Sequence, residues 1–126
     1  NFSFSGLKTS VLYTLNKLSD PNRADIAASF QEAVVDVLVQ KTMRAAREYQ
    51  PKSIILAGGV AANLELRSRL KKVAGEIDLP VFVPPLVYSM DNAAMIAVAG
   101  YYRAMDKNNF VDPLTLHADP NLDIEV

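Results

Sequence analysis

The sequence has 126 residues, half of them are hydrophobic, and its formal net charge at pH 7 is −1. This length predicts a single domain with a real core, and the near-neutral charge excludes a general attraction to nucleic acids or membrane surfaces. Because the sequence has no cysteine, disulfides and thiolate metal sites are excluded. The lack of cysteine suits a cytoplasmic protein, and because no apolar run reaches the length of a membrane span, we expect no membrane association.

The charges are distributed unevenly along the chain. Residues 1–105 contain twelve Lys and Arg against nine Asp and Glu, whereas residues 106–126 contain one against five. We therefore expect a mildly basic body, residues 1–105, followed by an acidic and loosely packed tail, residues 106–126. The chain begins with Asn1 rather than with methionine, which we interpret as a sign that it is a piece of a longer protein.

The first part of the chain predicts two helices. Phe alternates with polar residues over residues 1–5, which favours a short half-buried strand or an extended segment. From Gly6 onward the apolar residues recur at helical spacing, until an Asp-Pro pair near residue 20 ends the helix. A longer helix is predicted from about residue 23 to residue 49, with Asn22 as its N-cap. Its apolar stripe contains Ile26, Phe30, Ala33, Val34, Val37 and Leu38.

A strand, a glycine turn and a helix follow. The apolar run 54–57 ends at Gly58 and Gly59, and such short runs are typical of buried parallel strands. Apolar residues then recur at helical spacing up to the region of Gly75, a natural helix C-cap. A second parallel strand is predicted at residues 80–84, so these elements form a βαβ crossover.

A last helix is predicted to begin at Asp91. Its first half consists almost entirely of Ala, Met, Ile and Val, and a helix that is apolar all round is expected to be buried. The order of elements predicts an α/β protein with a small, largely parallel sheet of three short strands flanked by helices.

The turn at Gly58 and Gly59 is the first candidate site. Backbone N–H groups and a helix N-terminus would lie there at the carboxyl end of a strand, where open α/β sheets bind anionic ligands. A glycine pair equally suits a turn that only requires positive φ, so a purely structural role stays open. Asn63 has the same two interpretations, because its side chain can cap the helix or bind a ligand on the turn.

Asp91 is the second candidate. Its carboxylate can cap the last helix, or it can bind a divalent cation at the carboxyl end of the sheet. One carboxylate is not a metal site, and the single histidine, His117, lies in the acidic tail, where we expect it to be solvated. The sequence contains no Ser-His-Asp set, HExxH motif or Walker A lysine, so nothing in it completes an active site.

A basic run lies on the helix after the glycine turn. Most runs of this kind are solvated helix faces, and the sharper alternative is a contact with a phosphate backbone. The run consists of Arg67, Arg69, Lys71 and Lys72.

Four segments together resemble a known family. They are FSFSGLKT at residues 2–9, DIAASFQEAVVDVLVQKT at 25–42, LAGGVAAN at 56–63 and DNAAMIAVAGYY at 91–102. Together they are similar to the C-terminal half of the tRNA N6-threonylcarbamoyladenosine transferase family, formerly labelled O-sialoglycoprotein endopeptidase or glycoprotease. The resemblance covers about residues 1–105, with the segments in order. It implies a partial ribonuclease-H-like lobe of the actin-like ATPase fold, which sugar kinases and Hsp70 also have.

The resemblance also implies site residues. In the family the glycine turn holds the adenosine part of a nucleotide, a role that falls on Gly58 and Gly59, with Asn63 contacting the nucleotide. The aspartate of the last segment is a metal ligand, which falls on Asp91. The implied cofactors are one divalent metal, iron or zinc, shared with two histidines of the absent N-terminal half, and an adenylate, threonylcarbamoyl-AMP or ATP. Met90 stands where the family often has Thr, and this change touches no ligand atom.

The implied activity is transfer of a threonylcarbamoyl group from threonylcarbamoyl-AMP to N6 of adenosine 37 in tRNAs that read ANN codons. The implied partners are tRNA, a paralogous actin-like subunit and a small ATPase. We expect the chain alone to be inactive, because it carries one metal ligand and one side of the nucleotide cleft, and to self-associate through exposed apolar surface. The alternatives are a non-catalytic actin-like paralogue or assembly lobe and, with less support, the metalloprotease of the old label.

Overall fold

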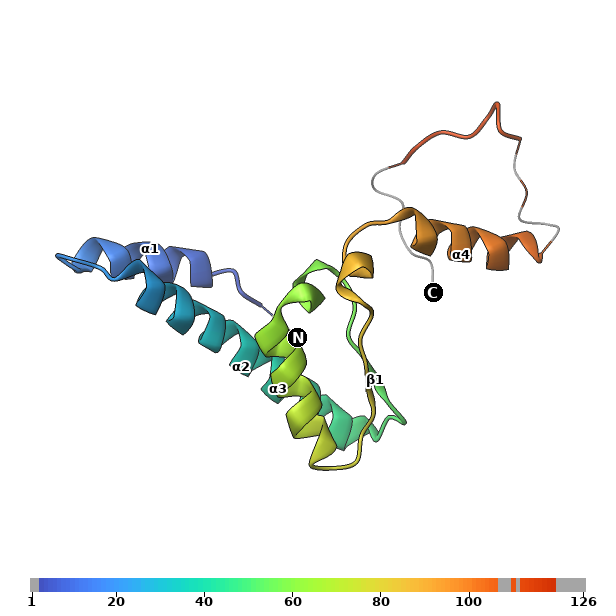
Figure 1. The fold of residues 1–126 in the computed structure, drawn as a ribbon. Helices are drawn as coiled ribbons and strands as arrows, with labels where there is room; N and C mark the ends of the chain where they lie inside the picture. The colour runs from blue at the N-terminus through green and yellow to red at the C-terminus, as the bar shows by residue number, and fades with distance from the viewer. Residues whose placement is uncertain (1–2, 107–109, 111, 120–126) are drawn as a thin grey trace. The chain divides into compact units, whose positions relative to one another are not determined.

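The computed structural model describes residues 3–106, 110 and 112–119, which divide into two compact units, residues 1–90 and 91–126. The predicted division after residue 105 separates the family resemblance from the acidic tail, and it stays a prediction. The elements are α1 (Leu7–Lys17), α2 (Arg23–Tyr49), β1 (Ile54–Ile55), the 3-10 turn η1 (Gly59–Ala62), α3 (Leu64–Gly75), β2 (Val81–Phe82), the 3-10 turn η2 (Leu86–Tyr88) and α4 (Ala93–Ala104) (Figure 1).

The predicted βαβ crossover is confirmed. Strands β1 and β2 are parallel, with Ile54 paired to Val81, and α3 connects them. The N–H of Ile54 donates to the carbonyl of Pro80 at 2.8 Å, and the N–H of Leu56 donates to that of Phe82 at 2.9 Å. The protein is therefore α/β, as predicted, with a two-stranded sheet in the part of the chain that the structure describes.

Of the two alternatives for residues 1–5, the strand is wrong for residues 3–5, which form no strand, so the described sheet has two of the three predicted strands. Residues 1 and 2 lie outside the described residues. The strand after α2 is also less buried than predicted. Ile55 is 75% exposed and its partner Phe82 is 60% exposed, whereas Ile54 and Val81 pack against the core. The reason is that helices of this unit cover only one face of the sheet.

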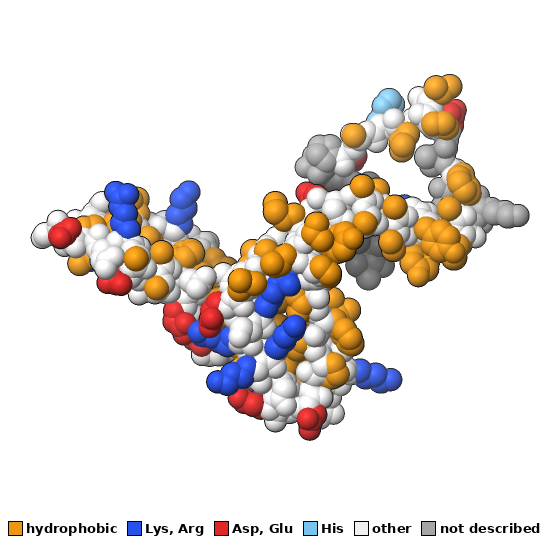
Figure 2. Space-filling model, in the orientation of Figure 1, with side chains coloured by type: hydrophobic (Ala, Val, Ile, Leu, Met, Phe, Trp, Pro, Cys, Tyr) orange, Lys and Arg blue, Asp and Glu red, His pale blue; other side chains and the backbone are white. Residues whose placement is uncertain are grey.

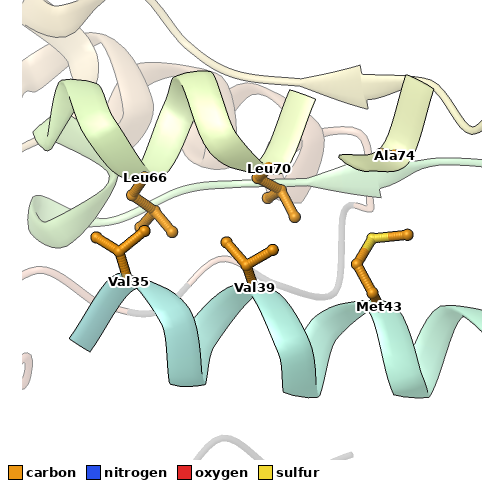
Figure 3. Packing of buried hydrophobic residues seen from close by; sticks show 6 residues of the cluster. All are labelled: Val35, Val39, Met43, Leu66, Leu70 and Ala74. Carbon is orange, nitrogen blue, oxygen red and sulfur yellow. The ribbon is translucent and has the colours of Figure 1, made fainter. Parts of the chain in front are cut away.

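The core lies between α2 and α3. On each helix the buried side chains are spaced about four residues apart, and they face those of the other helix (Figure 3). In Figure 3, Val35 and Val39 of α2 point toward Leu66 and Leu70 of α3. This spacing places successive side chains on one side of each helix, so the two stripes pack along their length. The buried residues of this cluster are Val35, Val39, Met43, Leu66, Leu70 and Ala74.

The bounds of α1 and α2 agree with the prediction, but the buried face of α2 does not. Asn22 caps α2 as expected, because its Oδ1 accepts from the N–H of Ala24 at 3.0 Å. The predicted stripe includes Phe30, which is 42% exposed, while the buried side chains lie one position further along, beginning with Val35. Of the predicted stripe, Leu38 packs against the core. Ile26 and Phe30 instead line an open apolar groove of about 860 Å³ beside α1, together with Leu7, Val11, Leu15, Pro21 and Ala27 among others.

The last helix, α4, differs from the prediction in its start and in its burial. It begins at Ala93 rather than Asp91, and no residue of α4 is buried. Figure 2 shows its apolar side chains exposed. The described part of residues 91–126 contains no second helix or strand that would cover α4, so its apolar surface stays open. None of the described helices combines the length and the hydropathy that crossing a membrane requires.

An ion-pair bracket joins α2 to α3 on the surface. The two terminal nitrogens of Arg69 each donate to one carboxylate oxygen of Glu32, both at 2.6 Å, and Nη2 also donates to Glu65 at 2.8 Å. The hydrogen bonds from Arg69 hold the pKa of the Glu32 carboxyl below its ordinary value. The same contacts raise the pKa of Arg69.

We expect the Arg69→Gln substitution to return the pKa of Glu32 to its ordinary value. Because the pKa of Glu32 is lower in the folded protein, the pair adds stability at neutral pH, and this contribution is lost as the pH falls through the lowered pKa. An NMR titration of the Glu32 carboxyl carbon measures the change. Lys72→Gln on the same helix is the control and should leave that pKa as it is. An unchanged pKa of Glu32 in Arg69→Gln would show that the ion pair between Arg69 and Glu32 does not form in solution.

Candidate functional site

The two glycines of the turn are not equivalent. Gly58 has φ 89° and ψ 173°, a conformation that L side chains rarely adopt, and its carbonyl accepts from the N–H of Ala61 at 3.0 Å to start η1. Gly59 has no positive φ, and a Cβ built there would meet no atom within 4 Å. The purely structural interpretation therefore accounts for Gly58, whereas no contact within the described chain requires glycine at position 59.

Asn63 is the N-cap of α3, as one of its two interpretations predicted. Its Oδ1 accepts from the N–H of Leu66 at 2.9 Å, which satisfies one of the free donors at the helix start. Its Nδ2 donates to Oε1 of Gln31 on α2, also at 2.9 Å. The carboxamide is thus held in one orientation, and contact between Asn63 and a ligand stays a prediction. Sequence reasoning missed Gln31, because a pair so far apart in the chain leaves no local pattern.

Arg67 connects two loops of the first unit. Its Nε donates to the backbone carbonyl of Ala61 in η1, and its Nη2 donates to the hydroxyl of Ser89 at 2.7 Å. Ser89 is only 3% exposed, and it is the buried polar residue of the described chain. It follows η2 and precedes Asp91 by two positions. Neither the partner of Arg67 nor the burial of Ser89 was apparent from the sequence.

The basic run on α3 is therefore not a single surface. Figure 2 shows Lys and Arg side chains gathered over this helix. Arg67 and Arg69 are held by partners within the chain, while Lys71 and Lys72 are exposed. The solvated-face interpretation holds for the two lysines, and their contact with a phosphate backbone stays a prediction.

Asp91 is exposed and does not cap α4, so the capping interpretation is wrong. The adjacent Asn92 is the cap, with its Oδ1 accepting from the N–H of Met95 at 3.0 Å. Among the residues that the structure describes, no group of three or more His, Cys, Asp or Glu could hold a metal ion. His117 is exposed in the tail. A metal bound through Asp91 would need its other ligands from outside these residues.

Comparison with known proteins assigns the family. The model of the family described as tRNA N6-adenosine threonylcarbamoyltransferase matches residues 1–98. The chain belongs to the tRNA N6-adenosine threonylcarbamoyltransferase family. This finding confirms the family resemblance of the four sequence segments. The matched range contains the glycine turn and the start of the segment that begins at Asp91.

Individual members of the family are similar over nearly the whole chain. Proteins named tRNA N6-adenosine threonylcarbamoyltransferase are 51% identical in Thermosipho africanus over 126 residues and 52% identical in Thermotoga neapolitana over 124 residues. The protein of the same name from Moorella thermoacetica is 50% identical over 126 residues. These matches cover 97% to 98% of this chain but only 36% to 38% of the relatives. The chain therefore spans a little over a third of the length of these curated relatives.

Proposed function

We propose that the full-length protein containing this chain transfers a threonylcarbamoyl group from threonylcarbamoyl-AMP to N6 of adenosine 37 in tRNAs that read ANN codons. The observation that carries this proposal is the family match over residues 1–98, which includes the glycine turn. In the reaction the N6 nitrogen forms a bond to the carbamoyl carbon, the bond from that carbon to the phosphate oxygen breaks, AMP leaves, and N6 loses a proton.

The proposed fold is the actin-like ATPase superfold, in which this chain forms part of the C-terminal ribonuclease-H-like lobe. The parallel strands β1 and β2 with α3 as their crossover are compatible with such a lobe. The open outer face of the sheet, where Ile55 and Phe82 are exposed, is compatible with further chain from the longer protein.

The proposed nucleotide site is the turn formed by Gly58 and Gly59, together with Asn63. Gly58 supplies the unusual backbone conformation, and Gly59 leaves room for close approach of the adenosine part. Gln31 holds the Asn63 carboxamide in place, so the side chain is oriented before a ligand arrives. The start of α3 adds a positive helix-dipole end, which favours the negatively charged adenylate.

The proposed metal ligand in this chain is Asp91, with iron or zinc as the metal and two histidines from the N-terminal half as further ligands. Because Asn92 caps α4, the Asp91 carboxylate is not used for capping and fits the role of a donor. The described residues alone offer no complete set of donors, so the proposal assigns the other ligands to the rest of the protein. When bound, the metal would polarise the transferred carbonyl.

The proposed partners are tRNA, a paralogous actin-like subunit and a small ATPase, all acting in the cytoplasm.

A second candidate function is an assembly lobe without catalysis. The exposed apolar side chains of α4, such as Ile96 and Tyr101, favour a surface that another polypeptide covers. The isolated chain is expected to self-associate through such surfaces. Loss of transfer on substitution in the glycine turn separates the catalytic function from the assembly function.

We expect full-length protein to transfer the threonylcarbamoyl group to tRNA, and Gly59→Ala to lower the rate at least about tenfold by blocking close approach of the nucleotide. Residues 1–126 alone should show no transfer. Gly59→Ala should leave the unfolding free energy within about 0.5 kcal/mol of wild type, because the added Cβ meets no atom. Gly58→Ala is the contrast and should lose about 1–3 kcal/mol of stability, because φ 89° with ψ 173° is a backbone conformation that is essentially restricted to glycine.

Transfer is measured with labelled threonine in the tRNA, and stability by urea denaturation. A full-length protein that leaves adenosine 37 unmodified in the presence of threonylcarbamoyl-AMP and its partner proteins would overturn the proposed activity. Full activity of Gly59→Ala would show that the nucleotide does not bind closely at the turn, and would overturn the proposed nucleotide site.

A further inference from the structure

One guanidinium group holds the loop after the glycine turn and the loop after β2 in a fixed relation. The Nε of Arg67 donates to the Ala61 carbonyl, two residues after Gly59, and its Nη2 donates to the Ser89 hydroxyl at 2.7 Å. Ala61 is 1% exposed and Ser89 is 3% exposed, so both ends of this bridge are buried. Breaking the bridge would leave buried polar groups without these partners, which is costly.

The charge of Arg67 distinguishes this bridge from the neighbouring bracket. Arg69 is paired with the carboxylates of Glu32 and Glu65. Arg67 donates to a carbonyl and a hydroxyl, and among the described residues it forms no ion pair with a carboxylate. A positive charge without a carboxylate partner therefore lies one hydrogen bond away from η1, which Gly58 begins. Such a charge favours an anionic ligand at the turn.

Arginine is well suited to this bridge and lysine is not. Nε and Nη2 lie in one rigid plane, so a single side chain can reach two acceptors in separate loops at a fixed separation. The ammonium group of lysine carries its three donors on one nitrogen at the end of a flexible stem, so it lacks the planar fork that places two donors toward separate loops. A conservative Arg67→Lys substitution keeps the charge but loses the fixed geometry.

We propose that Arg67 is a positioning residue for the adenylate: it fixes η1 against the Ser89 loop, so that the turn at Gly58 and Gly59 is preorganised for the nucleotide. This inference rests on the proposed nucleotide site. Preorganisation lowers the ordering cost of binding, so the effect appears in nucleotide affinity rather than in the chemical step. The contact of Arg67 with this part of the chain is the hydrogen bond to the Ala61 carbonyl in η1, so its proposed role is positioning.

The test uses full-length protein and AMP, the product that leaves the site, as the calorimetric probe. Arg67→Gln should weaken AMP binding and raise the KM for threonylcarbamoyl-AMP by about tenfold to a hundredfold, the usual effect of losing a charged hydrogen bond, with a smaller change in kcat. Arg67→Lys should recover little of the affinity. Ser89→Ala, which removes one acceptor and keeps the charge, should weaken binding less than Arg67→Gln.

Arg69→Gln is the matched control, with the same substitution two residues along the same helix. It should lower the melting temperature while the AMP dissociation constant stays within about twofold, because its partners lie on α2 and the first turn of α3. If Arg67→Gln fails to fold, Arg67→Lys and Ser89→Ala carry the comparison, and normal AMP affinity in both would overturn the inference.

The outcomes separate the inference from the proposed function. Wild type that binds AMP while Arg67→Gln binds it equally well would overturn the role of Arg67 alone. An equal loss of affinity in Arg69→Gln would reduce Arg67 to a general structural role and also overturn the inference. Wild type that does not bind AMP would overturn the nucleotide site at the turn, and the inference with it.

Discussion

Replacing Asp91 by alanine is expected to weaken binding of the divalent metal to the full-length protein at least about a hundredfold and to abolish threonylcarbamoyl transfer. Loss of a residue that hydrogen-bonds to a metal ligand already lowers metal affinity about tenfold to a hundredfold, and loss of a ligand itself lowers it more. The structure sharpens this prediction, because Asp91 is exposed and α4 is capped by Asn92. Asp91→Ala should therefore change the unfolding free energy by less than about 0.5 kcal/mol.

The neighbouring residue is the matched control. Asn92→Ala removes the acceptor for the Met95 N–H and should cost about 1 kcal/mol of stability, while the metal content stays that of wild type. Elemental analysis of purified protein gives the metal content, and urea denaturation gives the stability. Normal metal content and normal transfer in Asp91→Ala would show that this residue does not hold the metal, and would overturn the proposed metal site.

The elements that could be predicted from the sequence have strong local signals. Asn22 before an amphipathic run marks the start of α2, because a short polar side chain satisfies the first free N–H groups. The glycine pair after a short apolar run marks the passage from β1 to α3, because the chain has a positive φ at Gly58. Each of these signals acts within a few residues, so the bounds of α2 and the strand-turn-helix order of the βαβ unit follow from them.

The features that could not be predicted depend on contacts between distant segments. Asp91 and Asn92 are both good caps, and the choice between them depends on the backbone at the start of α4. Bridges such as that from Arg67 to Ser89 join residues far apart in the chain, which leave no spacing to detect. The burial of α4 was predicted from its composition, yet composition does not show whether a covering element belongs to the same stretch of chain.

The face of α2 that packs was also beyond prediction, because this helix carries apolar residues on more than one side. The predicted stripe has regular helical spacing, but its Ile26 and Phe30 line the groove beside α1. The side chains that reach the core are those opposite α3, beginning with Val35. Periodicity identifies apolar faces, and only the position of the second helix decides which face becomes buried.

The largest stability effect is expected from Leu70→Ala. Leu70 is 2% exposed and lies in the cluster between α2 and α3, beside Leu66 and opposite Val39 (Figure 3). Removing its side chain takes apolar atoms out of a packed interface and leaves a cavity, which costs about 2–5 kcal/mol. The same helix holds the Asn63 cap and Arg67, so loosening α3 should also lower nucleotide affinity.

Leu64→Ala is the matched control, since it is the same substitution at the first residue of α3, where the side chain is 67% exposed. It should cost less than about 0.5 kcal/mol in urea denaturation of the full-length protein. A cost below about 1 kcal/mol for Leu70→Ala would mean that the packing of α2 on α3 does not hold the core. The turn at Gly58 and Gly59 would then have to be held in place by contacts other than those of α3.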